Sequence, residues 1–355
     1  MRRTLLVLAA ALIAACTAEP QPAASDGPRL APGQALGRIA FASCIDQERP
    51  QPIWDRVLDY RPELFVFAGD NVYGDTGGVG PDFLAAAYRK QRGQAGFMAV
   101  KNRIPHHAVW DDHDYGKNDG GVEYAHKADA QRQFAEFWNL PADDPRRGRE
   151  GIYHAAIHGP PGRRVQVVLL DARYFRSALK PTDSRGARGR ERYLPDDDPA
   201  KTMLGAAQWQ WLEAELRKPA ELRLIVSGIQ VLAEGHGWER WGNLPRERRR
   251  LFDLIAATRA NGVVFLSGDR HLGALYRETE GVPYPLTEIT SSGINRYFPN
   301  ALEAGPNRLG NVFGQPNFGA IEIDWAAGTV RLSIRDGEGQ AQREAVLKLA
   351  ELAAK

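Results

Sequence analysis

Five short apolar runs, rich in β-branched and aromatic residues, constrain the fold of this chain more than any other feature of its sequence. They alternate with helix-like stretches and occupy residues 64–68, 107–110, 165–170, 222–227 and 263–267. Such runs are typical of buried strands, and their alternation with helices is typical of sheets that helices cover. The sequence therefore predicts an α/β fold. Near the end of the chain, residues 318–334 predict a β-hairpin and residues 345–353 a closing helix.

Side chains able to carry chemistry follow several apolar runs directly, at the point where each predicted strand ends. Run 39–42 precedes Cys44, run 64–68 precedes Asp70 and Asn71, run 107–110 precedes Asp112, His113 and Asp114, run 165–170 precedes Arg173, and run 263–267 precedes Asp269 and His271. Ligands of α/β proteins bind beyond the carboxyl ends of the strands. We therefore expect these side chains to converge in one crevice.

The residue types at these positions are those of a metal site with mixed ligands: carboxylates, an imidazole and a thiolate. Taken alone, Asp70 after a glycine could be a turn residue, and the acidic segment 111–114 a solvated loop. Several such clusters in chain order favour a metal site. Carboxylates gathered together repel one another unless cations neutralise them, so two or more ions are expected. Two metals about 3.5–4 Å apart can activate a bridging hydroxide that attacks a phosphorus ester.

The beginning of the chain has the pattern of a bacterial export signal. Arg2 and Arg3 precede an apolar run at 5–15 that is too short to span a bilayer. The run ends in Leu-Ile-Ala-Ala followed by Cys16, which is typical of a lipobox and predicts cleavage before Cys16 and its lipidation. A plain secretory signal cut elsewhere is the alternative, and the arginine pair leaves the export route open.

The sequence thus predicts three parts: a signal peptide at 1–15, a flexible tether rich in Ala, Pro and Gly at 16–37, and one catalytic domain at 38–355. We expect the protein on the periplasmic side of a bacterial membrane, with the outer membrane favoured, or secreted or periplasmic if the lipobox is not used. The formal charge of +2, from 46 Lys and Arg against 44 Asp and Glu, disfavours a general polyanion binder. No nucleic-acid-binding module or protein partner is expected.

Taken in order, the motifs resemble those of the alkaline phosphatase D (PhoD-like) family of metallophosphatases. The resemblance rests on Ser-Cys at 43–44, Gly-Asp-Asn-Val-Tyr-Gly-Asp at 69–75, Trp-Asp-Asp-His-Asp-Tyr-Gly-Lys-Asn-Asp at 110–119, Leu-Asp-Ala-Arg-Tyr-Phe-Arg at 170–176, Leu-Gly-Ala-Ala-Gln-Trp-Gln-Trp-Leu at 204–212 and Ser-Gly-Asp-Arg-His at 267–271. It implies a four-layer α/β/β/α sandwich of two mixed sheets covered by helices. It also implies a site that holds Fe³⁺ and Ca²⁺ and hydrolyses phosphate esters.

The resemblance implies a role for each candidate residue. The metal ligands would be Cys44, Asp70, Tyr88, Asp112, Asp269 and His271, with the Cys44 thiolate and the Tyr88 phenolate on the iron. His113 would protonate the leaving oxygen, and Asp114 would orient its imidazole. Arg173 and Asn71 would contact the substrate. Tyr88 could instead be a packed helix residue, and Arg173 could form a salt bridge to Asp171 or a neighbour.

Two other functions stay open at this point. One is a phosphodiesterase specific for lipid head groups, teichoic-type polymers or nucleic acid. The other, less favoured because every expected ligand type is present, is a non-catalytic lipoprotein that binds phosphate or glycan. In the favoured interpretation the substrate is a phosphate ester and the membrane contact is the lipid on Cys16. With Cys44 bound to metal, the two cysteines of the chain form no disulfide.

Overall fold

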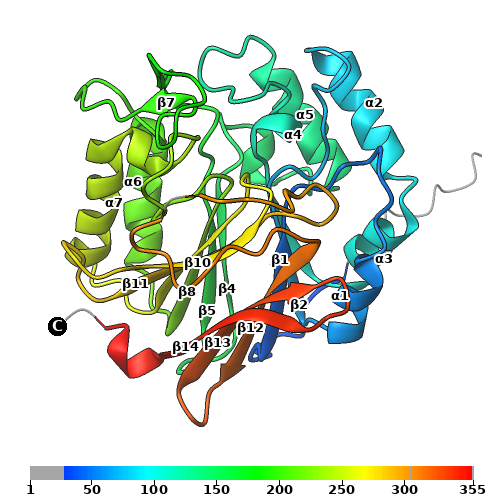
Figure 1. Ribbon diagram of the computed structural model, residues 1–355. Helices are drawn as coiled ribbons and strands as arrows, with labels where there is room; N and C mark the ends of the chain where they lie inside the picture. The colour runs from blue at the N-terminus through cyan, green and yellow to red at the C-terminus, as the bar shows by residue number, and fades with distance from the viewer. Residues whose placement is uncertain (1–27, 304, 354–355) are drawn as a thin grey trace, which may run out of the picture.

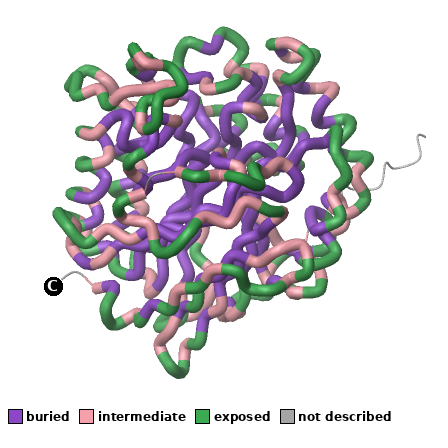
Figure 2. The backbone as a smooth tube through the Cα atoms, in the orientation of Figure 1, coloured by how far each residue is buried: buried purple, intermediate pink, exposed green. Residues whose placement is uncertain are grey.

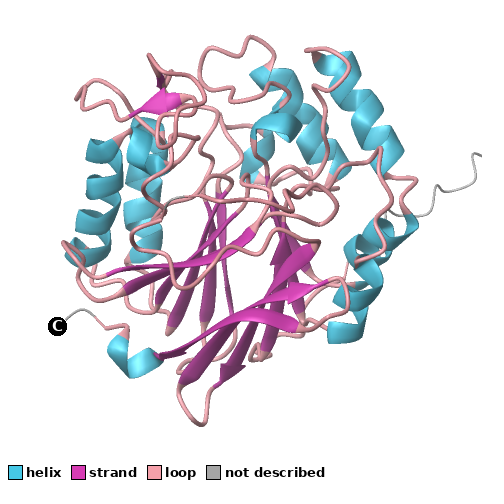
Figure 3. Ribbon diagram, in the orientation of Figure 1, coloured by secondary structure: helices cyan, strands magenta, loops and turns pink. Residues whose placement is uncertain are grey.

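The computed structural model describes residues 28–303 and 305–353, and it contains two six-stranded sheets. Helices lie on the outer sides of the sheets (Figures 1 and 3). The predicted signal peptide, Cys16 and the first part of the predicted tether lie outside the described residues. Among the helices of the described part, none is long and apolar enough to cross a membrane.

The first sheet is mixed. Its order is β14 (Ala341–Lys348), β13 (Thr329–Asp336), β12 (Asn317–Asp324), β1 (Arg38–Ala42), β2 (Leu64–Ala68) and β3 (His106–Val109). Strands β1, β2 and β3 run parallel, and β12 pairs antiparallel with β1 and begins an antiparallel extension through β13 and β14. The three parallel strands therefore end at one edge of the sheet.

The second sheet is also mixed, with an antiparallel strand at each side. Its order is β10 (Gly273–Glu278), β11 (Leu286–Ser291), β9 (Val263–Ser267), β8 (Leu222–Ser227), β5 (Val165–Leu169) and β4 (His154–His158). The four inner strands are parallel. Every residue of β5, β8 and β9 is buried, which explains why these runs are mostly apolar. A small separate ribbon pairs β6 (Lys180–Pro181) with β7 (Tyr193–Leu194).

The helices form the outer layers. Next to the first sheet lie α1 (Trp54–Tyr60), α2 (Pro81–Gln91), α3 (Ala95–Arg103), α4 (Asp112–Tyr115) and α5 (Lys127–Phe137), and next to the second lie α6 (Gly205–Leu216) and α7 (Pro245–Ala257) (Figure 1). Short 3₁₀ turns are η1 (Pro145–Arg147), η2 (Trp241–Asn243) and η3 (Leu349–Glu351). Trp54 of α1 joins the layers, since its ring lies 5.8 Å from Phe65 of β2 and 5.7 Å from Phe97 of α3.

This architecture confirms the predicted α/β fold of two mixed sheets covered by helices, and all five apolar runs form strands. The predicted closing helix at 345–353 is wrong, because residues 341–348 form β14 and pair with β13. Buried backbone extends beyond the sheets into the loops at the ends of the parallel strands (Figure 2). Loops buried to this degree need internal partners for their polar groups, and these loops carry the site.

Candidate metal centre

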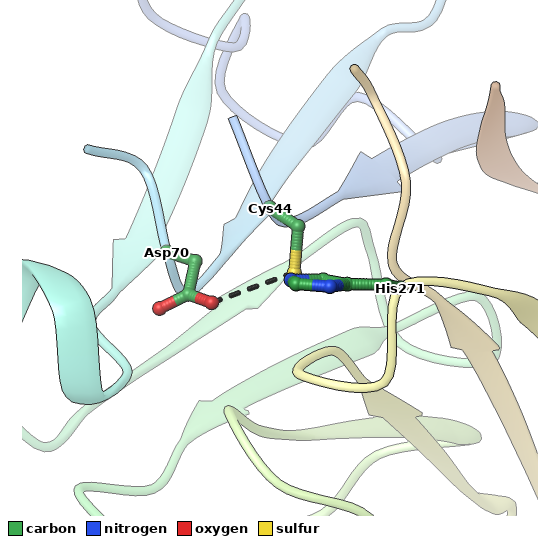
Figure 4. A group of neighbouring side chains, drawn as sticks. All are labelled: Cys44, Asp70 and His271. Carbon is green, nitrogen blue, oxygen red and sulfur yellow. Dashed lines mark hydrogen bonds between the residues drawn. The ribbon is translucent and has the colours of Figure 1, made fainter. Parts of the chain in front are cut away.

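The ends of β1, β2 and β9 bring Cys44, Asp70 and His271 together (Figure 4). One ligand atom from each of the three lies within 4.8 Å of the others. The thiol of Cys44 is 3.5 Å from Oδ2 of Asp70. The hydroxyl of Ser292 lies 2.9 Å from the same sulfur and accepts the backbone N–H of His271 at 2.7 Å. The first sheet thus contributes Cys44 and Asp70 to this group, and the second contributes His271.

The backbone at these positions is unusual. Cys44, Asp70, Asp269 and His271 all have positive φ, between 49° and 68°, a region that residues other than glycine seldom adopt. Such conformations cost free energy and persist where the surroundings enforce them, most often at functional sites. Gly69 shows how tight the packing is, because a Cβ atom there would lie 2.7 Å from Cβ of Asp111. The strand ends are therefore shaped to direct side chains inward.

Three further groups adjoin the first, and all three contain Asp112, which lies at the start of α4. They are Asp70 with Asp112 and His113, Asp111 with Asp112 and Asp269, and Asp112 with Asp119 and Glu239. Within each group the candidate ligand atoms again lie within 4.8 Å of one another. The structure thus places a continuous series of potential ligands from Cys44 to Glu239.

The charge state of this series indicates that cations belong in it. Burial, together with the negative charges of neighbouring groups, raises the pKa of Asp70 well above its usual value and that of Asp269 to about 8. Within the described residues, Oδ1 of Asp112 and Oδ2 of Asp269 are buried without a hydrogen-bond donor. Buried acceptors without donors are rare because they are costly. Metal ions would supply the missing positive charge, so the residues present fit such ions.

A tyrosine also lies in the first group, but it is Tyr73 and not Tyr88. The hydroxyl of Tyr73 is 3.0 Å from Nε2 of His271 and 3.4 Å from Oδ2 of Asp70. Tyr88 lies in α2 with its ring 4.5 Å from that of Phe137, and its buried hydroxyl has no partner among the described residues. The structure thus places Tyr73, and not the predicted Tyr88, in contact with the candidate ligands Asp70 and His271. Tyr73 lies three residues after Asp70 in the same motif, and that spacing was the signal for it.

His113 has a carboxylate partner, although it is not the one expected. Its Nδ1 lies 2.6 Å from Oδ1 of Asp75. Burial opposes protonation, but the negative charges of Asp112 and Asp75 outweigh it and raise the pKa of His113 to about 9. Asp114 is instead occupied by the backbone, accepting the N–H groups of Asp70, Asn71 and Asp111. Asp75 therefore takes the orienting role predicted for Asp114.

The two residues expected to contact substrate are also placed elsewhere. The guanidinium of Arg173 is fully buried and pairs with Asp111 at 2.6 Å and Glu239 at 2.7 Å. Asn71 is buried as well, and its side-chain amide donates to the backbone carbonyl of Val109 at 2.8 Å. Arg173 thus forms the salt bridge held open as its alternative, although not to Asp171. Neither residue lines the cavity. Both instead contact buried groups next to the candidate ligands.

A cavity of about 150 Å³ opens beside the carboxylates. It is lined by Asp112, His113, Asn118, Asp119, Arg192, Trp238, Glu239, Asp269, Arg270, His271 and Phe298. The sequence did not single out Arg192, Glu239 or Phe298, because their loops lie outside the strand-end pattern. Arg192 precedes β7, is 32% exposed at its side chain and pairs with Asp119 at 2.5 Å.

The two mixed sheets flanked by helices, with a carboxylate-rich centre at their strand ends, define a metallophosphatase fold. Comparison with known proteins gives the family: the PhoD-like phosphatase model matches residues 39–304, and the chain belongs to this family. Its members are phosphoric ester hydrolases, as the resemblance of the motifs implied.

Individual relatives agree with this assignment. Alkaline phosphatase D of Bacillus subtilis (strain 168) is 24% identical over 322 residues, in a match that covers 74% of this chain and 52% of that protein. The chain therefore spans about half the length of this curated relative. The solved structure of PhoD superposes with a TM-score of 0.69 at 18% identity, covering 90% of this chain and 70% of the other. Purple acid phosphatase PPD1 from yellow lupin gives 0.58 at 12% identity, covering 90% and 55%. These two similarities concern the fold.

Proposed function

We propose that this chain is an exported, metal-dependent alkaline phosphatase that hydrolyses phosphate monoesters and also phosphodiesters. One observation carries the proposal: a cavity lined by buried carboxylates also contains His113, whose Nδ1 is held 2.6 Å from Asp75. Carboxylates of this kind suit cations that bind phosphoryl oxygens, and a protonated imidazole suits an ester oxygen that must leave as an alcohol.

The donor sets support two kinds of metal ion. Once deprotonated, Cys44 and Tyr73 join the Asp70 carboxylate as the anionic donors that a trivalent ion such as Fe³⁺ favours, and His271 adds a neutral imidazole. The carboxylate groups around Asp112 provide the oxygen donors that Ca²⁺ favours. When bound, these ions would supply the Lewis acidity needed to activate water and to stabilise charge on the phosphoryl group.

The side chains of the protein bind the substrate and move a proton. Because Asp75 engages Nδ1 of His113, Nε2 of that ring is left for the ester oxygen, and the Asp75 carboxylate favours the protonated ring. Arg192 replaces Arg173 as the candidate for binding phosphoryl oxygens. It lines the cavity and uses Nη1 for Asp119, while its Nε and Nη2 have no hydrogen bond to any described residue.

The test combines metal content with turnover. Protein purified without chelators should contain iron and calcium by mass spectrometry and should hydrolyse both p-nitrophenyl phosphate and bis(p-nitrophenyl) phosphate. Cys44→Ala should lose iron and activity together. The ratio of the two kcat/KM values separates a broad monoesterase from a dedicated diesterase. If metal-replete protein turned over neither substrate and Cys44→Ala kept its iron, the proposal would fail.

Export as a lipoprotein is proposed on the sequence pattern that ends at Cys16. Expressed in a bacterial host, the protein should enter the detergent phase on Triton X-114 partition, and Cys16→Ser should remain in the aqueous phase. Partition of the unmutated protein into the aqueous phase would contradict lipidation.

A further inference from the structure

We infer that the mouth of this cavity is a subsite for an apolar, ring-bearing substituent of the phosphate ester, and that Phe298 is its main contact. The inference deepens the proposed function and rests on it, because it assigns a place to the part of the substrate that leaves.

The cavity is too small to enclose a whole phosphate ester. Pockets that enclose a whole small-molecule ligand commonly measure about 300–1,000 Å³, and this one measures about 150 Å³. Its lining includes the carboxylates of Asp112, Asp119, Glu239 and Asp269, which would hold the cations. The remaining space suits the phosphoryl group alone. The substituent on the ester oxygen must therefore extend outward, over whichever residues line the mouth.

Phe298 is the lining residue best suited to receive that substituent. It is 52% exposed, which is unusual for a large aromatic side chain in a cavity otherwise rich in charge. Its ring lies 4.7 Å from the ring of His271, a candidate metal ligand. One side of Phe298 thus contacts His271, and about half of the residue is left open to solvent and to a bound ester.

The loop that carries Phe298 is held against the site by a hydrogen bond and an ion pair. The backbone N–H of Phe298 donates to the carbonyl of His271 at 2.9 Å. Further along the same loop, Glu303 forms an ion pair with Arg270, the residue before His271. Two contacts with consecutive residues at the end of β9 therefore hold the ring beside the metal centre. Ordering of an aromatic contact before binding lowers its entropic cost.

The rest of the lining adds a second aromatic surface. The guanidinium groups of Arg192 and Arg270 lie 5.2 Å and 4.9 Å from the ring of Trp238, so this indole is held by two cations. Trp238 and Phe298 both line the cavity. An ester bearing an aromatic ring could contact such rings, whereas a small alkyl ester would leave Phe298 in water. Selection among esters should therefore depend on the substituent, although the phosphoryl group is common to all.

The test uses two substrates whose leaving alcohols differ little in basicity, benzyl phosphate and ethyl phosphate. For the metal-loaded protein we expect kcat/KM to favour benzyl phosphate by about five- to tenfold, the size of one aromatic contact. In Phe298→Ala this ratio should fall at least about threefold, any remainder being the contact with Trp238, and Phe298→Tyr should restore it. Phe83→Ala is the matched control, because Phe83 is 44% exposed and does not line the cavity. That variant should keep the original ratio.

A binding measurement separates this inference from the proposed function. Calorimetry with benzylphosphonate and ethylphosphonate, which are not hydrolysed, should show the same preference and the same loss in Phe298→Ala. A preference for benzylphosphonate without turnover of either phosphate would reject the proposed function and retain the subsite. Equal ratios in the unmutated protein and in Phe298→Ala, in both assays, would overturn the subsite while leaving phosphatase activity intact.

Discussion

The hydroxyl of Tyr73 lies 3.0 Å from Nε2 of His271, although 198 residues separate the two in the sequence. Tyr73 follows β2 of the first sheet and His271 follows β9 of the second, so the contact joins the ends of both sheets. An isolated bridge between Ser43 and Ser292 joins the same two sheets close by. The candidate metal centre therefore lies where the sheets meet, and its candidate ligands come from both sheets.

The phenol of Tyr73 can be tested by removing one oxygen atom. Tyr73→Phe should lower the iron content and reduce kcat by at least about tenfold, because the group at Cys44 loses an anionic donor. Tyr88→Phe is the matched control: its hydroxyl has no partner among the described residues, so its loss should leave iron content, activity and stability unchanged or slightly improve stability. Equal iron content in both variants would contradict the role given to Tyr73.

The pairing of Asp75 with His113 predicts a shift in the pH dependence of turnover. Asp75 raises the pKa of His113 by its hydrogen bond and its charge, so Asp75→Asn should lower that pKa. The protonated imidazole is then lost at a lower pH. The alkaline limb of the kcat profile should move down by about one pH unit, and kcat should fall about 10²-fold at its optimum. An unchanged alkaline limb would mean that His113 is not the titrating acid.

Arg173 should act on stability, whereas Arg192 should act on the substrate. Arg173→Met leaves the buried Asp111 without its cation and leaves Glu239 with Arg176 alone, so it should cost about 3–5 kcal/mol in the free energy of unfolding. Arg192→Met, at a partly exposed pair, should change stability by less than about 1 kcal/mol and raise KM about tenfold. Urea unfolding and steady-state kinetics on both variants measure this contrast. Similar unfolding curves for the two would be inconsistent with it.

His106 makes the fold sensitive to acid. Burial lowers its pKa to about 4, and its ring packs 5.6 Å from Phe67 and 5.5 Å from Trp138. The unfolded chain, with a pKa near 6.5, binds a proton that the folded chain rejects, so stability is complete above pH 6.5 and falls as the pH drops toward 4. Between pH 7 and pH 4.5, the loss in the free energy of unfolding should be smaller by about 2 kcal/mol in His106→Gln than in the unmutated protein. Parallel urea midpoints across that range would rule the effect out.

Removal of the metal ions should create a pH dependence of the opposite sign. Burial and neighbouring charges raise the pKa of Asp269 to about 8 in the folded chain, against about 4 when unfolded. The metal-free folded state therefore binds more protons across that window, and its stability should fall as the pH rises from about 4 to about 8. Bound cations should remove the decline. Unfolding free energies of chelated and reloaded protein, measured in parallel at each pH, provide the check.

The fold could be predicted from the sequence because its central strands are buried on both faces and so appear as short, mostly apolar runs. The end of the chain could not. Residues 345–353 have good helix formers, but Leu347 is buried between exposed Val346 and Lys348, and pairing with β13 fixes an extended backbone. Pairing with β13, and not the helix propensity of the segment itself, therefore determines its secondary structure.

The site shows the same division. The convergence of Cys44, Asp70, Asp112, Asp269 and His271 was expected, since parallel strands end at a common edge. Which of two similar side chains reaches the site could not be predicted, because it depends on the direction in which each side chain leaves the backbone. Packing determines whether Tyr73 or Tyr88 contacts the candidate metal ligands. It also determines whether Arg173 lines the cavity for substrate or pairs with Asp111, and a motif does not encode such packing.

Within the described residues, Asp112 belongs to three of the four groups that could hold a metal ion, so cations bound in these groups would share its carboxylate. Sharing makes their occupancies thermodynamically linked: an ion at one position changes the affinity of the next, and the reverse effect has the same size. Two cations that share one carboxylate also repel each other, so we expect the second ion to bind more weakly and the centre to fill stepwise. Under metal limitation the protein would then exist as a graded set of loaded forms, each with its own stability and turnover.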